Sequence, residues 1–318
     1  MAKARRSLVG RVVAITGGAR GIGRATAAAL IAKGARVAIG DIDEQLARAT
    51  AEQMGAGTIG LPLDATDRPS FTAFLDEVER RLGPLDVLVN NAAIMPIGSF
   101  LEETDATAER MIATNVHGVL LGSKLALERF VPRRHGHLVQ LASVAGKMGF
   151  AGGATYCATK HAVVGLSESL RAELRGTNVD LSVVMPVVVK TEFGAGLPQT
   201  RSFKPVEPGD VANAIVEALQ TGRYDVYVPR SVAGMVRSAA LMPRSMAEAI
   251  GRVLKGDQVL AHPDHLARVA YETRIAETIA KGQAGLASAA PDLQAAQESP
   301  SAPAPESESA GEPEREAV

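Results

Sequence analysis

Short apolar runs alternate with segments of helical periodicity over the first 230 residues of the chain. Several runs are continuous rather than alternating, which is typical of strands buried on both faces of a parallel sheet. The pattern predicts seven strands, at Arg11–Thr16, Arg36–Gly40, Thr58–Leu63, Leu85–Val89, His137–Leu141, Val179–Met185 and Asp225–Val228. Apolar positions at helical spacing fill the intervals and predict helices that include Ile22–Ala32, Ser70–Leu82, Ala106–Phe130, Ala158–Arg175 and Pro208–Gln220.

The order of these elements predicts an α/β fold. Strand–helix–strand units joined by right-handed crossovers give a doubly wound, mostly parallel seven-stranded sheet with helices on both faces. After Pro229 only helical periodicity remains, at Val232–Leu254 and His262–Ala280. From about Ser288 the chain is rich in Ala, Pro, Ser and Glu, a composition that cannot offset the entropy of ordering it. We therefore predict an α/β domain at 1–230, a helical extension packed on it at 231–287 and a disordered acidic tail at 288–318.

Composition and charge narrow the classes of function. Of 318 residues, 46% are hydrophobic and 22% charged, which is ordinary for a globular protein, and the net charge of −1 gives no reason to expect a nucleic-acid partner. The tail carries seven acidic residues and one arginine, a net charge of −6, which leaves +5 on the remainder. The single cysteine, Cys157, excludes an intramolecular disulfide and a Cys-based zinc site, and we predict no metal site. The sequence contains no run of about 20 apolar residues that could cross a membrane, so we expect a cytoplasmic protein.

A glycine-rich loop, Thr16-Gly17-Gly18-Ala19-Arg20-Gly21-Ile22-Gly23, separates the first strand from the first helix. Glycine lets the backbone approach a pyrophosphate, whose charge then meets the amides of the helix N-terminus. A tight strand-to-helix turn is the alternative. Asp41 ends the second strand about 20 residues later, where a carboxylate reaches the ribose hydroxyls of adenosine. Together the loop and the acid predict a Rossmann-type dinucleotide-binding domain.

Asp41 also bears on the choice of dinucleotide. Its carboxylate accepts hydrogen bonds from a free 2′-hydroxyl and repels a 2′-phosphate, and Arg20 could offset that repulsion. The sequence therefore favours NAD over NADP.

Tyr156 and Lys160 are four residues apart at the entry to a predicted helix, so both side chains lie on one helical face. A free phenol has a pKa of about 10, too high for a base near neutrality. An ammonium about 4 Å away contributes roughly 4 kcal/mol at an effective dielectric of 20, which would lower that pKa by roughly three units. Taken alone, the pair is more typical of an ordinary amphipathic helix.

Other polar residues follow strands at the same edge of the sheet. Ser143 follows the fifth strand, where its hydroxyl could bind a substrate oxygen or cap a turn. Asn90-Asn91-Ala92-Ala93 follows the fourth strand. Asn115 lies inside a predicted helix, where Asn is unfavourable unless it binds a water or a backbone group.

In combination these elements resemble the short-chain dehydrogenase/reductase family, in its single-domain branch. The resemblance spans about Leu8 to Pro229 and rests on Thr16-Gly17-xxx-Gly21-x-Gly23, Asp64, Asn90-Asn91-Ala92-Ala93, Asn115, Ser143, Tyr156-xxx-Lys160 and Pro186-xxxx-Thr191. It implies catalytic roles for four residues. Ser143 orients the substrate carbonyl and Tyr156 is the general acid/base, so both contact the substrate. Lys160 binds the nicotinamide ribose and lowers the tyrosine pKa, and Asn115 holds a water of the proton relay.

The resemblance also implies a dinucleotide site. Asp64, Ala65 and Asn91 would flank the adenosine side, and Val189 and Thr191 the carboxamide side. The predicted cofactor-binding residues are Thr16, Gly17, Arg20, Gly21, Ile22, Gly23, Asp41, Asp64, Ala65, Asn91, Tyr156, Lys160, Val189 and Thr191. The family usually forms homodimers or homotetramers, and we expect one of these.

Two positions depart from the family pattern: Ala93 replaces a glycine, and Val187 replaces the glycine that usually follows the proline. The branched Val187 narrows the space beside the nicotinamide. The residues expected to border the pocket are mostly apolar, and they are Met95, Ile97, Met148, Phe150, Val187 and Phe193. This favours a lipophilic secondary alcohol or ketone as the substrate. Glu192–Phe203 is a candidate lid.

Alternatives to an NAD(P)-dependent oxidoreductase remain at this point. One is a non-catalytic dinucleotide-binding regulator or scaffold, which would gain nothing from keeping Ser143, Tyr156 and Lys160. Another is an epimerase or dehydratase relative, which usually has a larger substrate domain. Val232–Leu254 is basic and amphipathic, which permits peripheral membrane contact, although such a helix more often covers a core or a subunit contact.

Overall fold

The fold of the chain is built on one parallel sheet. The computed structural model describes residues 5–198, 204–243, 245, 246, 249, 260, 261, 263, 264 and 266–277. Seven strands pair in the order β3-β2-β1-β4-β5-β6-β7, and every pair is parallel. The strands are β1 (Val12–Thr16), β2 (Arg36–Asp41), β3 (Ile59–Pro62), β4 (Val87–Asn90), β5 (Gly136–Leu141), β6 (Val179–Pro186) and β7 (Asp225–Val228). The predicted doubly wound sheet is confirmed.

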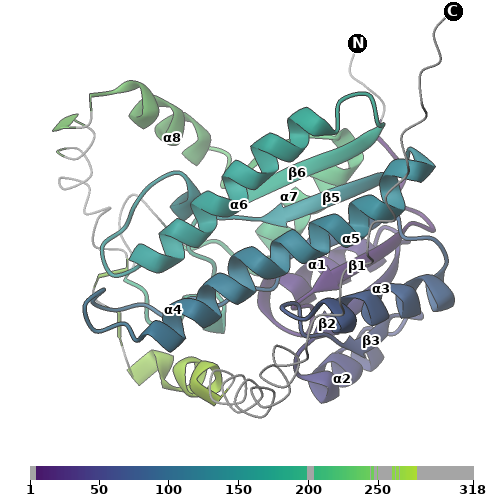
Figure 1. Ribbon diagram of the computed structural model, residues 1–318, viewed down its shortest axis with the longest axis horizontal. Coiled ribbons are helices and arrows are strands. Elements are labelled where there is room, and N and C mark those ends of the chain that lie inside the picture. Colours follow the sequence, from purple (N-terminus) through teal and green to yellow (C-terminus); the bar gives the residue numbers. More distant parts are fainter. Residues whose placement is uncertain are drawn as a thin grey trace, which may run out of the picture. The chain divides into compact units, whose positions relative to one another are not determined.

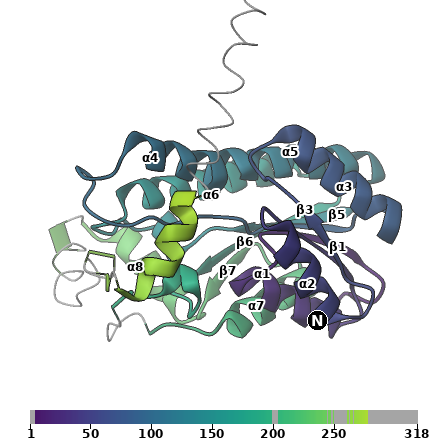
Figure 2. The ribbon, with the colours of Figure 1, turned by 90° about the horizontal axis from the view of Figure 1, so that it is seen from below.

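Helices cover both faces of this sheet (Figures 1 and 2). Figure 2 shows α3, α4 and α5 on one side and α1, α2 and α7 on the other. Their bounds are α1 (Gly21–Ile31), α2 (Glu44–Met54), α3 (Arg68–Leu82), α4 (Asp105–Ile112), α5 (Gly118–Arg133), α6 (Ala154–Glu173), α7 (Pro208–Thr221) and α8 (Val232–Leu241). Because helices cover both faces, the strands are mostly apolar, and every residue of β1 and β4 is buried.

Some helices differ from the prediction. The sequence did not predict α2, which begins after the N-cap Asp43, whose side chain accepts from the Leu46 amide. The predicted Ala106–Phe130 helix is interrupted by one π-helical turn, η1 (Ala113–His117). Helix α6 begins at Ala154 rather than Ala158, and Gly153 is its N-cap. The catalytic pair of the prediction therefore lies within the first two turns of α6.

The C-terminal part of the chain is described only in part. Of the predicted Val232–Leu254 helix, α8 covers Val232–Leu241, and of His262–Ala280 a helix covers 266–277. The predicted tail at 288–318 lies outside the described residues. The division into three parts stays a prediction.

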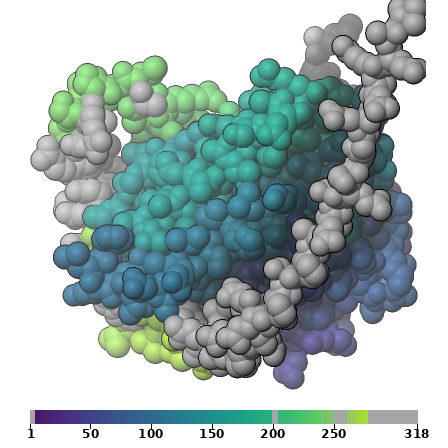
Figure 3. Space-filling view, in the orientation of Figure 1, coloured from purple at the N-terminus to yellow at the C-terminus, as the bar shows by residue number. Residues whose placement is uncertain are grey.

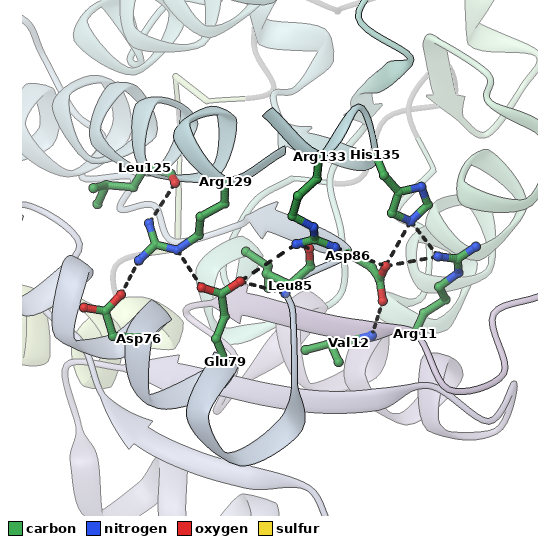
Figure 4. A network of polar contacts seen from close by, with 10 residues as sticks. All are labelled: Arg11, Val12, Asp76, Glu79, Leu85, Asp86, Leu125, Arg129, Arg133 and His135. Atoms are coloured by element: carbon green, nitrogen blue, oxygen red, sulfur yellow. Dashed lines mark hydrogen bonds and ion pairs between the residues drawn. The ribbon is translucent and has the colours of Figure 1, made fainter. Parts of the chain in front are cut away.

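Parallel strands give the sheet two chemically distinct edges. Winding reverses at β1, which lies between β2 and β4, so the crevice outside the carboxyl ends of β1 and β4 is the expected ligand site. At the amino edge lies an ionic network (Figure 4), in which Asp86, just before β4, binds Arg11 and His135 at 3.0 and 2.9 Å. Its second oxygen accepts from the Val12 amide at 2.9 Å. This network joins the starts of β1, β4 and β5.

Candidate active site

The glycine loop lies at the carboxyl edge, between β1 and α1. Gly17 and Gly21 have φ of +61° and +50°, which favours glycine at both positions. A Cβ on Gly17 would lie 3.0 Å from Ala92 Cα, and one on Gly23 would collide with the Gly17 carbonyl oxygen. Gly18, which was not among the predicted cofactor residues, is equally constrained, since its Cβ would lie 2.5 Å from Ile39 Cβ.

The start of α1 fits a bound pyrophosphate. Gly21, Ile22 and Gly23 form its first turn, and among the described residues no side chain caps it at Arg20. The amides of a first helical turn have no acceptor within the helix, and the helix dipole favours negative charge at that end. The loop and the uncapped turn therefore fit the phosphates of a dinucleotide, as predicted.

Thr16 and Asn91 hold the loop against the end of β4. The Thr16 hydroxyl accepts from the amides of Asn91 and Ala92 at 3.0 and 2.9 Å. The Asn91 side chain donates to the carbonyls of Thr16 and Gly17, both at 2.9 Å. Both side chains are thus engaged with backbone, so their part in cofactor binding is to shape the loop.

Asp41 and Arg20 are both near the loop but do not form a pair. The Asp41 carboxylate accepts from the amides of Ala19 and Asp43, each at 3.2 Å. Burial raises the pKa of Asp41 above its ordinary value, and those two amides partly offset the increase. Arg20 instead binds Asp43 at 2.7 Å. The sequence analysis did not identify Asp43. Its carboxylate neutralises the Arg20 guanidinium, the positive charge that would bind a 2′-phosphate.

The segments after β3 and β6 lie at the same edge of the sheet. The Asp64 carboxylate accepts from the amide and hydroxyl of Thr66 at 2.8 and 2.6 Å, so it shapes the turn at Ala65. After β6, Val189 is buried and pairs with Val206. A Cβ on Gly21 would lie 3.2 Å from Thr191 Cγ2, which places Thr191 directly beside the glycine loop. A direct contact of Asp64 with cofactor stays a prediction.

The catalytic residues of the prediction come together at the carboxyl ends of β5 and β6. The Ser143 hydroxyl lies near enough to the Tyr156 phenol to act against the rise in its pKa. The Lys160 ammonium lies 5.8 Å from the centroid of the Tyr156 ring and donates to the Leu141 carbonyl at 2.9 Å. Ser143 also caps η2 (Val144–Gly146) by accepting from the Ala145 amide at 3.1 Å. Turn capping and substrate binding, offered by the sequence as alternatives, are compatible roles for this hydroxyl.

The electrostatics of the pair differ from the prediction. Tyr156 and Lys160 are only 5% and 3% exposed. Burial raises the pKa of Tyr156 above its ordinary value, although the Ser143 hydroxyl opposes this. Burial also lowers the pKa of Lys160 to about 8. The expected lowering of the tyrosine pKa is therefore not met in this structure, because burial disfavours both the phenolate and the ammonium.

Asn115 lies in η1 and is fully buried. Its side chain accepts from the amide of Ile94 and donates to the carbonyl of Ile94, both at 2.8 Å. It also donates to the Thr159 hydroxyl at 3.2 Å, one residue before Lys160. The task expected of a mid-helix Asn is thus a backbone contact that connects the loop after β4 to α6.

The family model of the short chain dehydrogenases matches residues 11–202. The chain belongs to the short-chain dehydrogenase/reductase family. Sorbitol dehydrogenase of Cereibacter sphaeroides is 39% identical over 191 residues, which cover 60% of this chain and 75% of the relative. The 3-alpha-(or 20-beta)-hydroxysteroid dehydrogenase of Mycobacterium tuberculosis is 31% identical over 241 residues, which cover 73% of this chain and 93% of the relative.

A solved short-chain dehydrogenase/reductase from Burkholderia phymatum, in complex with NAD, has a similar structure. The TM-score is 0.68 at 27% identity, and the match covers 73% of this chain and 93% of the other. As a member of this family, this short-chain dehydrogenase/reductase is an enzyme that uses NAD or NADP to oxidise alcohols or reduce ketones. Within the described ranges, every helix is too short or too polar to span a bilayer.

Proposed function

We propose that this short-chain dehydrogenase/reductase interconverts a secondary alcohol and its ketone, with Tyr156 as the general acid/base. The observation that carries the proposal is that the Tyr156 phenol, the Ser143 hydroxyl and the buried Lys160 ammonium come together at the carboxyl edge. When bound, the dinucleotide supplies hydride transfer at its nicotinamide ring. The residues of the protein then have to bind the substrate oxygen and transfer one proton.

Each of the three residues has a separate part in that proton transfer. Ser143 presents a hydroxyl that can hydrogen-bond the substrate oxygen beside the phenol. In ketone reduction the Tyr156 O–H donates its proton to that oxygen as the carbonyl becomes an alcohol, and alcohol oxidation reverses the transfer. With a pKa of about 8, Lys160 is mostly charged near neutrality and stabilises the phenolate left behind. Asn115 positions the loop at Ile94 and α6, and we retain for it the predicted part in the water relay.

We favour NAD over NADP as the cofactor. Asp41 is held at the end of β2 by two backbone amides, in position to accept from ribose hydroxyls. Arg20, the residue best placed to bind a 2′-phosphate, already has Asp43 as its counter-ion at 2.7 Å. A solved relative in complex with NAD is consistent with this choice.

For the substrate we propose a lipophilic alcohol or ketone. The Phe193 ring lies 6.0 Å from that of Tyr156. Val187 and Met95, which the sequence also predicts to border the pocket, are apolar and buried. The two relatives named above act on a polyol and on a steroid, so their names do not choose between polar and lipophilic substrates. The apolar residues of this chain support the second class.

We further propose that the enzyme acts in the cytoplasm as a homodimer or homotetramer assembled through α5 and α6. The buried free thiol of Cys157 is compatible with a reducing compartment. Light scattering of the purified chain measures the oligomeric state, and a monomer would contradict this part of the proposal. A scaffold function is not favoured, because a scaffold has no use for the Ser143–Tyr156–Lys160 arrangement.

A screen of alcohols and ketones, with nicotinamide absorbance as the readout and NAD and NADP as cofactors, tests the function. Tyr156→Phe removes only the phenolic oxygen and should reduce the rate by about 10³-fold or more, since general acid/base catalysis contributes about 10²–10⁴. Tyr224→Phe is the matched control, because the Tyr224 ring contacts the Arg171 guanidinium near the far end of α6 and the change keeps that ring. Full activity of Tyr156→Phe would overturn the mechanism, and absence of turnover with every substrate would overturn the function.

A further inference from the structure

A helix at 266–277 lies outside residues 11–202 that the family model matches. It is yellow-green in Figures 1 and 2, and in Figure 3 its residues form part of the surface. One face is exposed at Leu266 and Val269, whereas Arg268, Tyr271 and Ile275 on the other face are buried. Arginine is almost never fully buried unless it is paired, so Arg268 is expected to bind residues elsewhere in the fold.

Arg268 binds two active-site loops at once. Its guanidinium donates to the carbonyl of Met95, after β4, at 2.9 Å, and to those of Ala195 and Phe193, after β6, at 2.9 and 3.2 Å. Its Nε donates to Glu272 at 3.1 Å. The side chain is 0% exposed. A planar guanidinium offers several donors in a rigid fork, so it fixes the distance between the two loops.

Tyr271 continues this arrangement toward the catalytic tyrosine. Its hydroxyl accepts from the Met95 amide at 2.7 Å, so Arg268 and Tyr271 satisfy both backbone groups of one residue. Its ring meets Phe193 edge-on at 5.9 Å, and Phe193 in turn meets Tyr156 edge-on at 6.0 Å. Three aromatic rings thus connect the helix directly to the proposed general acid/base.

Further contacts are made by this helix and by Leu260 and Asp264, which precede it. The Asp264 amide donates to the Gly196 carbonyl at 2.8 Å. Arg274 binds Glu192 at 2.8 Å, just before Phe193. Around Gly152, at φ +80°, a Cβ would collide with the Leu260 carbonyl oxygen, so the segment also approaches the loop after β5. The contacts converge on the loops that surround Tyr156.

We propose that the 266–277 helix is the outer wall of the substrate site, and that Arg268 and Tyr271 are positioning residues that hold Phe193 against Tyr156 and so limit substrate size. This inference rests on the proposed function of Tyr156. A helix that only covered apolar surface would need no buried guanidinium, whose removal from water is costly unless its donors are satisfied. Here those donors are satisfied by the loops that carry Met95 and Phe193.

Amide hydrogen exchange of the full-length chain tests the structural half without any need for activity. Arg268→Met keeps the length of the side chain and removes its donors. We expect exchange to rise about tenfold or more in peptides covering 92–97 and 191–196, which is the effect of losing a charged hydrogen bond, and to stay unchanged in β1 and β5. Val269→Ala, on the exposed face, is the matched control. Unchanged exchange in both loops, or an equal rise throughout the chain, would overturn the inference.

Tyr271→Phe is a milder second variant, which keeps the ring and removes only the acceptor of the Met95 amide. It should speed exchange in 92–97 and leave 191–196 unchanged, whereas no change at 92–97 counts against the inference. Should Arg268→Met fail to fold, Arg268→Lys is expected to raise exchange in both loops to a smaller degree, because an ammonium lacks the rigid fork.

Kinetics with ketones of increasing size tests the functional half. In Arg268→Met we expect the ratio of kcat/KM for a bulky ketone to that for a small one to rise about tenfold, since pocket contacts of one or two carbons have effects of that size. The increase should come from KM for the bulky ketone, and Val269→Ala should leave the ratio unchanged. An unchanged ratio would overturn the size limit. If the wild-type chain turns over nothing, the proposed function fails, while hydrogen exchange still decides whether the helix holds the two loops.

Discussion

Charged side chains have different partners at the two edges of the sheet. At the amino edge, Asp86 has Arg11 at 3.0 Å, His135 at 2.9 Å and a second arginine, Arg133, at 4.0 Å (Figure 4). At the carboxyl edge, the buried Lys160 ammonium has a backbone carbonyl as its hydrogen-bond acceptor, 2.9 Å away. At the amino edge the carboxylates of the network are paired with arginines. The carboxyl edge keeps charges in positions that the fold alone would not favour.

The pKa values show the same contrast. Burial shifts the pKa of Lys160 down to about 8 and those of Tyr156 and Asp41 upward, in each case toward the neutral form. These groups are the ones assigned to proton transfer and to cofactor binding. A bound ligand can supply charged or polar partners that these buried groups lack in the free protein. We therefore expect mutations at the carboxyl edge to change mainly the rate, and mutations at the amino edge to change mainly the stability.

The largest effect should follow Lys160→Met at the carboxyl edge. Met has a similar length and no charge, so the rate should fall about 10²–10⁴-fold because the phenolate loses its stabilising cation. The free energy of unfolding should stay the same or rise, since burying an ammonium is costly. The rate is measured by nicotinamide absorbance and the stability by urea unfolding. A rate within twofold of wild type would contradict the role assigned to Lys160.

At the amino edge, Asp86→Asn should do the reverse. The change leaves Arg11, Arg133 and His135 without their shared anion, so the free energy of unfolding should fall by about 2–3 kcal/mol, with the rate unchanged. Glu44→Gln, which breaks the exposed Arg48 pair, is the control and should cost less than about 1 kcal/mol. Equal losses in the two variants would show that the network is no better than a surface ion pair.

We expect a buried histidine in the amino half of the sheet to make the free energy of unfolding depend on pH. His137 in β5 is buried, which lowers its pKa to about 4, whereas an unfolded histidine has a pKa of 6.5. The unfolded chain binds more protons between these values, so this contribution is complete above pH 6.5 and is lost as the pH falls toward 4. Between about pH 7.5 and about pH 5 the loss amounts to roughly 2 kcal/mol.

His137→Gln should remove that slope, as measured by urea unfolding at the two pH values. His117→Gln, which changes an exposed histidine of η1, should keep it. A wild-type slope in His137→Gln would assign the pH dependence to other groups.

The smallest expected effect concerns the choice of cofactor. The Ala19 and Asp43 amides donate to different oxygens of Asp41, so Asp41→Asn keeps an acceptor for only one of them and removes the charge that repels a 2′-phosphate. The ratio of kcat/KM with NAD to that with NADP should fall about tenfold, the effect of one charged hydrogen bond. Asp67→Asn, which changes the exposed N-cap of α3, is the matched control. An unchanged ratio would remove Asp41 from cofactor selection.

The elements that the sequence predicted well are those with strong local signals. Apolar runs, several of them continuous, identified all seven strands, because burial on both faces leaves little polar alternation. Helix α2 was missed because the residues it buries, Ala47, Thr50 and Ala51, are small or only weakly hydrophobic, and its clearest signal is the cap at Asp43. The π-helical turn was missed because one extra residue hardly disturbs helical periodicity.

The candidate site divides in the same way. Glycines, Asp41, Ser143, Tyr156 and Lys160 were predicted because each follows a strand or starts a helix, and parallel strands bring those positions to one edge. The pairing of Arg20 with Asp43, which are 23 positions apart, was not predicted. Nor was Arg268, which is 173 residues from Met95, because no pattern within a local window connects the two.

The sequence by itself determined the order of strands and helices, the glycine loop and the presence of the Tyr156–Lys160 pair, because these depend on periodicity and on short spacings. Only the tertiary structure decided how far burial shifts the pKa values of that pair, which acid neutralises Arg20 and which segment closes the site. Those outcomes depend on distances between residues far apart in the chain, and such distances exist only once the sheet and its helices have packed.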